Sequence, residues 1–286
     1  MTEILTAIIV MTGLSLTFAV ILAVAYNFLR VEEDPRLEKV SELLPGNNCG
    51  ACGEPGCNAF ADLLVAGKVE PSKCTVADAD TLVVIGEFLG VDVGTREAVV
   101  ARLKCGGGRG RARSEGSYEG MESCRAATLV DGGGLACVWG CLGLSDCERV
   151  CTFDAIKMNE RALPTVDPEL CTACGDCVDV CPKDLFVLDK LEHKLFVQCN
   201  TPLAGEAALA MCTAACDGCS RCAADAPKDS VVMVGGLPVI HWDRPEKPGA
   251  EATWRCPTGA IQWIEGQQFS EEMEGEWEDE AWRRRA

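Results

Sequence analysis

The sequence lacks the residues that several functional classes require. Only two histidines are present, His193 and His241, and no CxxCH motif occurs, so haem attachment, Rieske-type ligation and histidine-based zinc catalysis are disfavoured. Basic side chains number 26 against 44 acidic ones, for a formal charge of −18, and this disfavours nucleic-acid binding, which needs a basic surface. Aromatic residues make up only 6% of the chain, whereas 20 of its 286 residues are cysteine. Cysteine, rather than an aromatic core, is therefore expected to organise the protein.

The N-terminal region is one long uncharged segment. Residues 4–29 contain no charged side chain, and as a helix they would span about 39 Å, enough to cross a bilayer with some tilt. A cleaved signal peptide is the alternative, but its apolar region is only about 7 to 15 residues long. Basic residues follow the segment at Arg30, Arg36 and Lys39, so the positive-inside rule predicts a single-pass inner-membrane anchor with the rest of the chain in the cytoplasm.

That orientation decides how the cysteines are interpreted. Thiols in the cytosol stay reduced, so a dense cysteine pattern there indicates metal binding or catalysis more than disulfides. The anchor carries no ionisable side chain, and a path for ions through a membrane normally needs one. We therefore expect this segment to anchor the protein and not to move ions by itself.

The strongest motif lies in the middle of the chain. Cys171, Cys174, Cys177 and Cys181 are followed by Pro182, which matches the bacterial ferredoxin pattern CxxCxxCxxxCP. In that pattern three thiolates bind one 4Fe-4S cluster and the fourth binds the other cluster. Thiolates also suit zinc, but the crossing ligand and the proline favour the two-cluster ferredoxin arrangement.

The partner motif is irregular, because Leu144 occupies the place of its second cysteine and Cys137 is the available substitute. Crossed ligation then predicts two clusters in this module. The ligands of the first are Cys137, Cys141, Cys147 and Cys181, and those of the second are Cys151, Cys171, Cys174 and Cys177.

The cysteine pattern also repeats with a period of 75 residues. The matching pairs are Cys124 and Cys199, Cys137 and Cys212, Cys141 and Cys216, Cys147 and Cys222, and Cys181 and Cys256. The repeat lacks all four ligands of one cluster, since the equivalent positions are Ala226, Glu246, Gly249 and Ala252. The second copy is therefore predicted to bind one cluster, through Cys216, Cys219, Cys222 and Cys256.

A separate four-cysteine block follows the anchor, at Cys49, Cys52, Cys57 and Cys74. Nearby glycines allow the backbone to wrap a bulky cluster, and a structural zinc site is the alternative. A helix is expected after Cys57, ending at Gly67. Four cysteines have no role in this scheme and are interpreted as buried or free thiols, with an additional metal site as the alternative: Cys105, Cys124, Cys199 and Cys212.

A glycine- and arginine-rich stretch, residues 105–123, is typical of a linker, and it contains no GxGxxG dinucleotide motif. Basic residues gather around it, at Arg96, Arg102, Lys104, Arg109, Arg111 and Arg113. We hypothesise that this basic stretch docks an acidic electron donor, and a merely solvated linker is the alternative.

The motifs LPGNNCGACGEPGCNAFA, CVWGCLGLSDCERVCTFDAI and CTACGDCVDVCP, together with the anchor, resemble the B subunit of the Rnf (or Rsx) ion-translocating electron-transport complex over nearly the whole chain. The resemblance implies a membrane-anchored electron carrier. It also implies membrane, flavin and iron-sulfur subunits as partners, soluble ferredoxin as the electron donor, and exchange with NAD coupled to ion movement in other subunits. It implies no catalytic site of the chain's own beyond electron transfer.

The expected fold class is α+β, with an N-terminal transmembrane helix, a small four-cysteine iron-sulfur domain and duplicated bacterial ferredoxin-like modules carrying four 4Fe-4S clusters in all. The expected segments are an anchor (1–30), an N-terminal 4Fe-4S domain (31–104), a Gly/Arg linker (105–123), a two-cluster module (124–198), a degenerate one-cluster module (199–268) and an acidic tail (269–286). Alternative functions are an iron-sulfur redox sensor, an electron-transfer subunit of another membrane redox complex, or a zinc scaffold.

Overall fold

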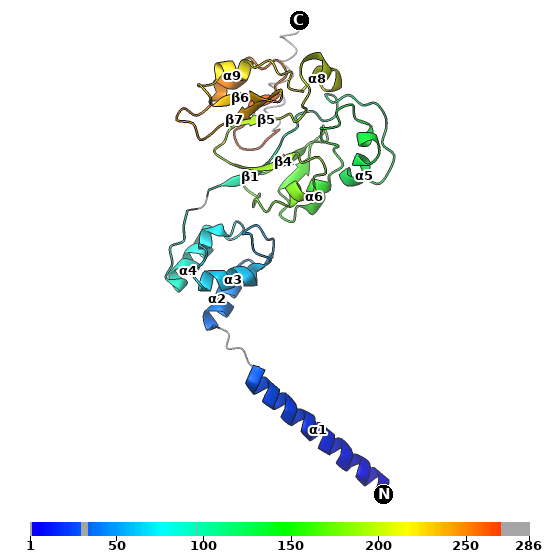
Figure 1. Cartoon of the computed structure of the whole chain (residues 1–286), viewed down its shortest axis with the longest axis vertical. Helices are drawn as coiled ribbons and strands as arrows, with labels where there is room; N and C mark the ends of the chain where they lie inside the picture. Colours follow the sequence, from blue (N-terminus) through cyan, green and yellow to red (C-terminus); the bar gives the residue numbers. More distant parts are fainter. Residues whose placement is uncertain (1, 30–33, 96, 270–286) are drawn as a thin grey trace.

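The computed structural model describes residues 2–29, 34–95 and 97–269, and Figure 1 shows them as three successive parts. A single long helix comes first, a small helical domain follows, and a larger body contains all the strands of the described residues. The expected acidic tail, apart from Phe269, lies outside the described residues. This mixture of helices and short strands confirms the α+β class with an N-terminal apolar helix.

The first helix, α1 (Thr2–Leu29), has the composition of a membrane span. Its stretch Ile4–Phe28 has a mean hydropathy of 2.5, and none of it is buried against the rest of the protein. A helix satisfies its own backbone hydrogen bonds, which is a requirement inside lipid. The hydroxyls of Thr6, Thr12 and Thr17 donate to carbonyls of the helix itself; for example, the Thr12 hydroxyl donates to the Ile8 carbonyl at 2.7 Å.

The small helical domain is built from α2 (Pro35–Leu43), α3 (Cys57–Val65), the 3₁₀ helix η1 (Pro71–Lys73) and α4 (Ala79–Leu89). The Asp78 carboxylate caps α4 by accepting from the Thr81 N–H at 2.6 Å, and Gly90 ends this helix at a positive φ of 67°. One apolar core joins the helices, through Val40, Phe60, Leu64, Leu82 and Ile85. This core holds the cysteine-bearing loops before α3 and around η1.

The body contains four two-stranded antiparallel sheets. They are β1 (Val99–Leu103) with β4 (Phe186–Lys190), β2 (Ile156–Met158) with β3 (Pro164–Val166), β5 (Leu195–Val197) with β8 (Ile261–Trp263), and β6 (Val231–Val234) with β7 (Leu237–Ile240). Short helices connect them: α5 (Cys124–Thr128), η2 (Asp131–Gly134), α6 (Asp146–Val150), α7 (Asp176–Val180), α8 (Gly205–Met211), α9 (Arg221–Asp225) and η3 (Ala250–Thr253).

Strand register shows how the two halves of the body correspond. Leu103 pairs with Phe186 in the first half, and Val197 pairs with Ile261 in the second. Phe186 and Ile261 are 75 residues apart, so Leu103 is the structural equivalent of Val197. Cys105 and Cys199, each two residues beyond these strand ends, are therefore equivalent. The 75-residue period had matched Cys199 with Cys124 instead; Cys124 lies in an insertion found only in the first half.

The segment 105–123 differs from the expected linker, because it is hydrogen-bonded along its length to the rest of the body. The Gly106 N–H donates to the Gln198 carbonyl at 2.8 Å, and the Arg113 N–H donates to the Met211 carbonyl at 2.8 Å. The preceding strand β1, expected in the N-terminal domain, pairs with β4 of the body. In the structure the body therefore begins near residue 99. Its glycine-rich stretch follows β1 in the first half and makes ordered backbone hydrogen bonds with the second half.

Candidate iron-sulfur sites

All 20 cysteines are described and none forms a disulfide. Among the described residues, no three or more His, Cys, Asp or Glu side chains converge closely enough to hold one metal ion. A zinc ion would require four sulfurs at about 2.3 Å from one point. Two sets of four cysteines instead each line a pocket, which is the arrangement that a larger metal-sulfide core requires.

The first such space lies in the small helical domain. The four predicted cysteines, Cys49, Cys52, Cys57 and Cys74, line one pocket. The Asn48 side chain fixes the loop by accepting from the Cys57 N–H at 2.8 Å. Gly50 and Gly53 take positive φ angles of 74° and 87°, so the CxxC loop curls in a way that favours glycine. Burial raises the pKa of the Cys52 thiol, and the nearby Cys74 and Cys49 sulfurs add to the rise.

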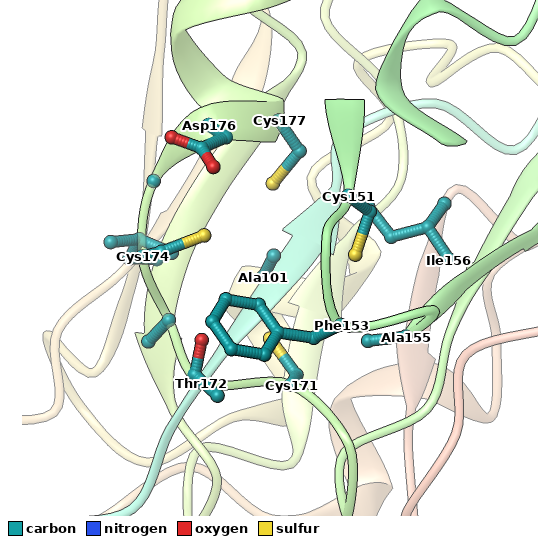
Figure 2. Close-up of a pocket in the computed structure, with 13 residues that line it drawn as sticks. Ala101, Cys151, Phe153, Ala155, Ile156, Cys171, Thr172, Cys174, Asp176 and Cys177 are labelled. Atoms are coloured by element: carbon teal, nitrogen blue, oxygen red, sulfur yellow. The ribbon is translucent and has the colours of Figure 1, made fainter. Parts of the chain in front are cut away.

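The second space is a pocket in the body, beside β1 and the loop that precedes α7. It is lined by Cys151, Cys171, Cys174 and Cys177, the set that crossed ligation predicted. Figure 2 shows the sulfurs of Cys151, Cys174 and Cys177 facing the same space, with the Phe153 ring beside Cys171. Burial raises the pKa of Cys177 to about 12, with contributions from the other three cysteines and from Cys147. Cys177 of this site therefore lies near Cys147, which belongs to the next group of cysteines.

The third group includes three of its four predicted cysteines, Cys141, Cys147 and Cys181. Burial raises the pKa of Cys147 to about 12, and the adjacent sulfurs of Cys124 and Cys181 add to the rise. Burial likewise raises the pKa of Cys124, again with Cys181 as a neighbour. The structure therefore places Cys124 near Cys147 and Cys181, although the sequence analysis had expected Cys137 there.

Cys137 lies in different surroundings. Burial raises the pKa of its thiol, and the cysteine that adds to this rise is Cys199 of the second half. Sequence spacing suggested Cys137 because it precedes Cys141 by four residues. The insertion that carries Cys124 instead folds back onto α6, which no local pattern in the sequence indicates.

The fourth set expected from the sequence lies in the second half and consists of Cys216, Cys219, Cys222 and Cys256. Burial raises the pKa of Cys222 to about 11, with contributions from Cys256 and Cys219. Burial also raises the pKa of Cys216 to about 12, and Cys256 and Cys222 are among its neighbours. These four side chains surround one site.

Where a second cluster would lie in this half, the structure has apolar packing. Ala252 is buried, and Ala226 packs against the same core, which also contains Val231 and Trp242. Small side chains and a tryptophan fill this region. The residues equivalent to the ligands of the second cluster, Ala226, Glu246, Gly249 and Ala252, include no cysteine that could bind a metal.

The predicted basic docking stretch is only partly at the surface. Arg102 is 2% exposed, and its guanidinium donates to the Gly266 carbonyl at 2.9 Å. Arg109 and Arg113 are exposed, and Arg96 lies outside the described residues. Arg102 is therefore a buried residue of the body and cannot contact a docked protein.

Comparisons with known proteins identify two iron-sulfur regions in this chain and the family to which it belongs. A family of Fe-S cluster domains matches residues 44–76, and the 4Fe-4S dicluster domain family matches residues 136–185. The B subunit of the Na⁺-translocating ferredoxin:NAD⁺ oxidoreductase complex of Acetobacterium woodii is 36% identical, over 90% of this chain and 78% of its own length. The chain belongs to the family of Rnf-type complex B subunits.

Other members of this family cover the chain just as fully. The B subunit of the ion-translocating oxidoreductase complex of Methanosarcina acetivorans is 31% identical over 90% of this chain and 97% of its own length. The B subunit of the proton-translocating ferredoxin:NAD⁺ oxidoreductase complex of Clostridium ljungdahlii is 34% identical over 92% and 94%. Family membership therefore extends across both halves of the body as well as the small domain.

Proposed function

We propose that this chain is the membrane-anchored electron-transfer subunit of an Rnf-type ion-translocating ferredoxin:NAD oxidoreductase complex. The observation that carries the proposal is the grouping of its cysteines in fours, two of which each line a single pocket. A cluster held by four thiolates accepts and releases one electron and leaves no open coordination position for bond-making chemistry. The chain therefore carries electrons and leaves other chemistry to its partners.

Four of the cysteine groups are the proposed ligand sets for 4Fe-4S clusters. The potential of such a cluster depends on its solvent exposure and on hydrogen bonds to its sulfurs, and the exposed Cys219 makes the set in the second half the most accessible at one ligand. The sets are Cys49, Cys52, Cys57 and Cys74; Cys124, Cys141, Cys147 and Cys181; Cys151, Cys171, Cys174 and Cys177; and Cys216, Cys219, Cys222 and Cys256.

The proposed topology is one membrane crossing by α1, with the small domain and the body on the cytoplasmic side. The length and apolar surface of α1 support the crossing, and the basic residues that follow it support the orientation. In this arrangement the anchor keeps the cysteine-rich parts near the membrane subunits of the complex.

Soluble ferredoxin is the proposed electron donor. Small ferredoxins are generally acidic, and a chain with a net charge of −18 would repel them on average. The exposed residues Arg109 and Arg113 provide local positive charge on the connection between the two halves. Arg109 and Arg113 are the proposed docking residues. Arg102 is left out of the proposed docking site because it is buried.

The test is to purify the full-length chain anaerobically in detergent and measure iron, acid-labile sulfide and zinc, followed by EPR during a redox titration. The proposal predicts at least about sixteen irons with equal sulfide, four for each proposed set, and signals that appear and disappear reversibly. A colourless protein with zinc and no sulfide would overturn it. Clusters that are lost or converted as the potential changes would indicate a sensor instead.

A further inference from the structure

The four cysteines left over by these ligand sets do not lie apart from one another. They are Cys105, Cys137, Cys199 and Cys212. They form two equivalent pairs: strand register matches Cys105 with Cys199, and the 75-residue period matches Cys137 with Cys212. Each half of the body thus contributes one cysteine after a strand and one just before its first cluster ligand.

Backbone hydrogen bonds bring the four segments that carry these cysteines together. Next to Cys105, the Gly106 N–H donates to the carbonyl of Gln198, the neighbour of Cys199, at 2.8 Å. Further along, the N–H of Thr213 donates to the Arg111 carbonyl at 3.0 Å, which places Cys212 on the same connection. The N–H of Ala136, the neighbour of Cys137, donates to the Arg113 carbonyl at 2.9 Å. One connection, residues 105–113, therefore joins all four.

Two of the four sulfurs, those of Cys105 and Cys212, lie beside Gly107. A Cβ at this glycine would lie 3.2 Å from the Cys212 sulfur and 3.7 Å from the Cys105 sulfur. Only a residue without a side chain leaves that space open, and the φ of Gly107 is not in the left-handed region. Glycine is therefore required at position 107 because a side chain would contact the two sulfurs, and not because of its backbone conformation.

Sulfur-sulfur proximity extends to the other two cysteines. Burial raises the pKa of Cys212, and the neighbouring sulfurs of Cys137 and Cys199 contribute to the rise. Burial raises the pKa of Cys105 to about 11, with contributions from Cys212 and Cys137. Each of the four sulfurs is thus close to at least one of the other three.

Two backbone donors point at this group in equivalent ways. The Cys141 N–H donates to the Cys105 sulfur at 3.4 Å, and the Cys216 N–H donates to the Cys199 sulfur at 3.2 Å. Such N–H···S contacts stabilise negative charge on sulfur and tune cluster potentials. Cys141 and Cys216 are themselves proposed ligands of the sets on either side.

We propose that Cys105, Cys137, Cys199 and Cys212 bind a further 4Fe-4S cluster at the junction of the two halves. The inference rests on the proposed function for the identity of the cofactor, and on the placement of four thiols for the site. With this set, all 20 cysteines of the chain fall into five groups of four. Because Cys141 and Cys216 contact its ligands directly, the site lies between the clusters of the two halves, as an intermediate station for one electron at a time.

The inference is tested by counting iron and sulfide in the full-length chain, purified anaerobically. Native mass spectrometry of the unaltered protein should show about twenty irons and twenty sulfides, four of each per site. Cys105→Ala and Cys212→Ala should each lose about four irons, or lose one iron and gain a three-iron EPR signal. The double variant Cys105→Ala/Cys212→Ala should lose only about four irons, because both residues bind one cluster.

A second double variant provides the control for Cys105→Ala/Cys212→Ala. Cys105→Ala/Cys57→Ala removes ligands from two different sites and should lose about eight irons. An unaltered protein with about sixteen irons, together with no loss in Cys105→Ala, would overturn this inference and leave the proposed function intact. Protein without any sulfide would instead overturn the proposed function itself. Since the mass of the unaltered protein needs no variant, the test holds even where a cysteine substitution prevents folding.

Discussion

The hydroxyl of Ser123 donates to Oδ2 of Asp146 at 2.9 Å, and this contact fixes the insertion to the first turn of α6. The same oxygen accepts from the Arg125 N–H at 3.2 Å. Ser123 and Arg125 flank Cys124, so one carboxylate holds this cysteine beside Cys147. Although burial acts to raise it, the pKa of Asp146 is lowered by these hydrogen bonds and by Arg149. The carboxylate is thus charged at neutral pH and holds the insertion in place.

Replacing Asp146 should weaken the cluster that Cys124 is proposed to bind. Hydrogen bonds to a charged group contribute about 1.5 to 3 kcal/mol each, and about 1.4 kcal/mol is a tenfold change in an equilibrium. Asp146→Ala is therefore expected to release about four irons to a chelator at least roughly tenfold faster, measured by iron release under anaerobic conditions. Asp154→Ala, which removes an exposed partner of Lys157, is the control and should release iron at the unaltered rate. Equal rates in both variants would contradict the prediction.

Moving a cysteine should distinguish Cys124 from Cys137 as the fourth ligand. Leu144 occupies the position equivalent to Cys219 in the second half. We expect Cys124→Ala to lose about four irons and Cys124→Ala/Leu144→Cys to regain them, because the second variant restores the regular CxxCxxC spacing. Iron analysis and EPR measure the outcome. If Cys137→Ala and Cys124→Ala remove the same EPR signal, the two cysteines share one site and the assignment is wrong.

Arg102 should influence the potential of the cluster proposed at Cys171. Burial lowers the pKa of its guanidinium, and the nearby Asp189 and Cys171 oppose that fall. Within the described part of the chain its Nε and Nη2 atoms have no hydrogen-bond partner, and its charge lies near Cys171. A positive charge stabilises a cluster that gains an electron.

Arg102→Gln is therefore expected to lower one midpoint potential, by on the order of 60 mV, which is a tenfold change for one electron. An EPR-monitored redox titration measures this shift. Arg109→Gln, at an exposed position, is the control and should leave all potentials in place. A potential that does not move in Arg102→Gln would show that its charge has no effect on the cluster.

The Gln268 side chain should stabilise the body by pairing with one residue of β1. Its Oε1 accepts from the Leu103 N–H at 2.9 Å, and its Nε2 donates to the Leu103 carbonyl at 2.8 Å, in a buried position. Loss of both bonds should cost about 2 kcal/mol. Gln268→Ala is expected to speed exchange of the Leu103 amide hydrogen by roughly 30-fold. Exchange in Gln267→Ala, the exposed neighbour, should match the unaltered protein, and equal exchange in both variants would remove this role for Gln268.

Charge reversal at the proposed docking residues should slow electron transfer from ferredoxin. Electrostatic steering changes association rates by about 10-fold or more at low salt, so Arg109→Glu/Arg113→Glu is expected to slow cluster reduction by about tenfold in stopped-flow experiments. The difference should disappear at high salt, since salt screens exposed charges. Arg244→Glu, exposed in the second half, is the control. An unchanged rate at low salt would place the docking site elsewhere.

Contiguous motifs allowed the sequence to predict much of the structure. The apolar run predicted α1, and the regular spacing of Cys171, Cys174 and Cys177 predicted which cysteines line the cavity shared with Cys151. In both cases the determining interactions are local: a span needs only length and composition, and a CxxCxxC turn brings its own sulfurs together.

The parts that the sequence did not predict depend on contacts between distant segments. Cys124 and Cys137 are both near Cys141 in the chain, and no local pattern indicates which of them folds back. The connection 105–113 has the composition of a flexible linker, yet it forms backbone hydrogen bonds with both halves, for example with Arg161 in the first and Gln198 in the second. A signal was present, however: Cys105 and Cys199 each follow a short apolar segment, VVARL and LFV, by two residues.

The pairing of Leu103 with Gln268 has a consequence for how the protein is made. A strand at the start of the body receives its last hydrogen-bond partner from a side chain 165 residues later, so the ribosome must synthesise nearly the entire chain before that edge is covered. Until then the nascent polypeptide exposes an open strand edge, a known site of aggregation. Slow or interrupted translation downstream of Leu103 would thus leave the protein vulnerable while its N-terminal helix is already available for membrane insertion.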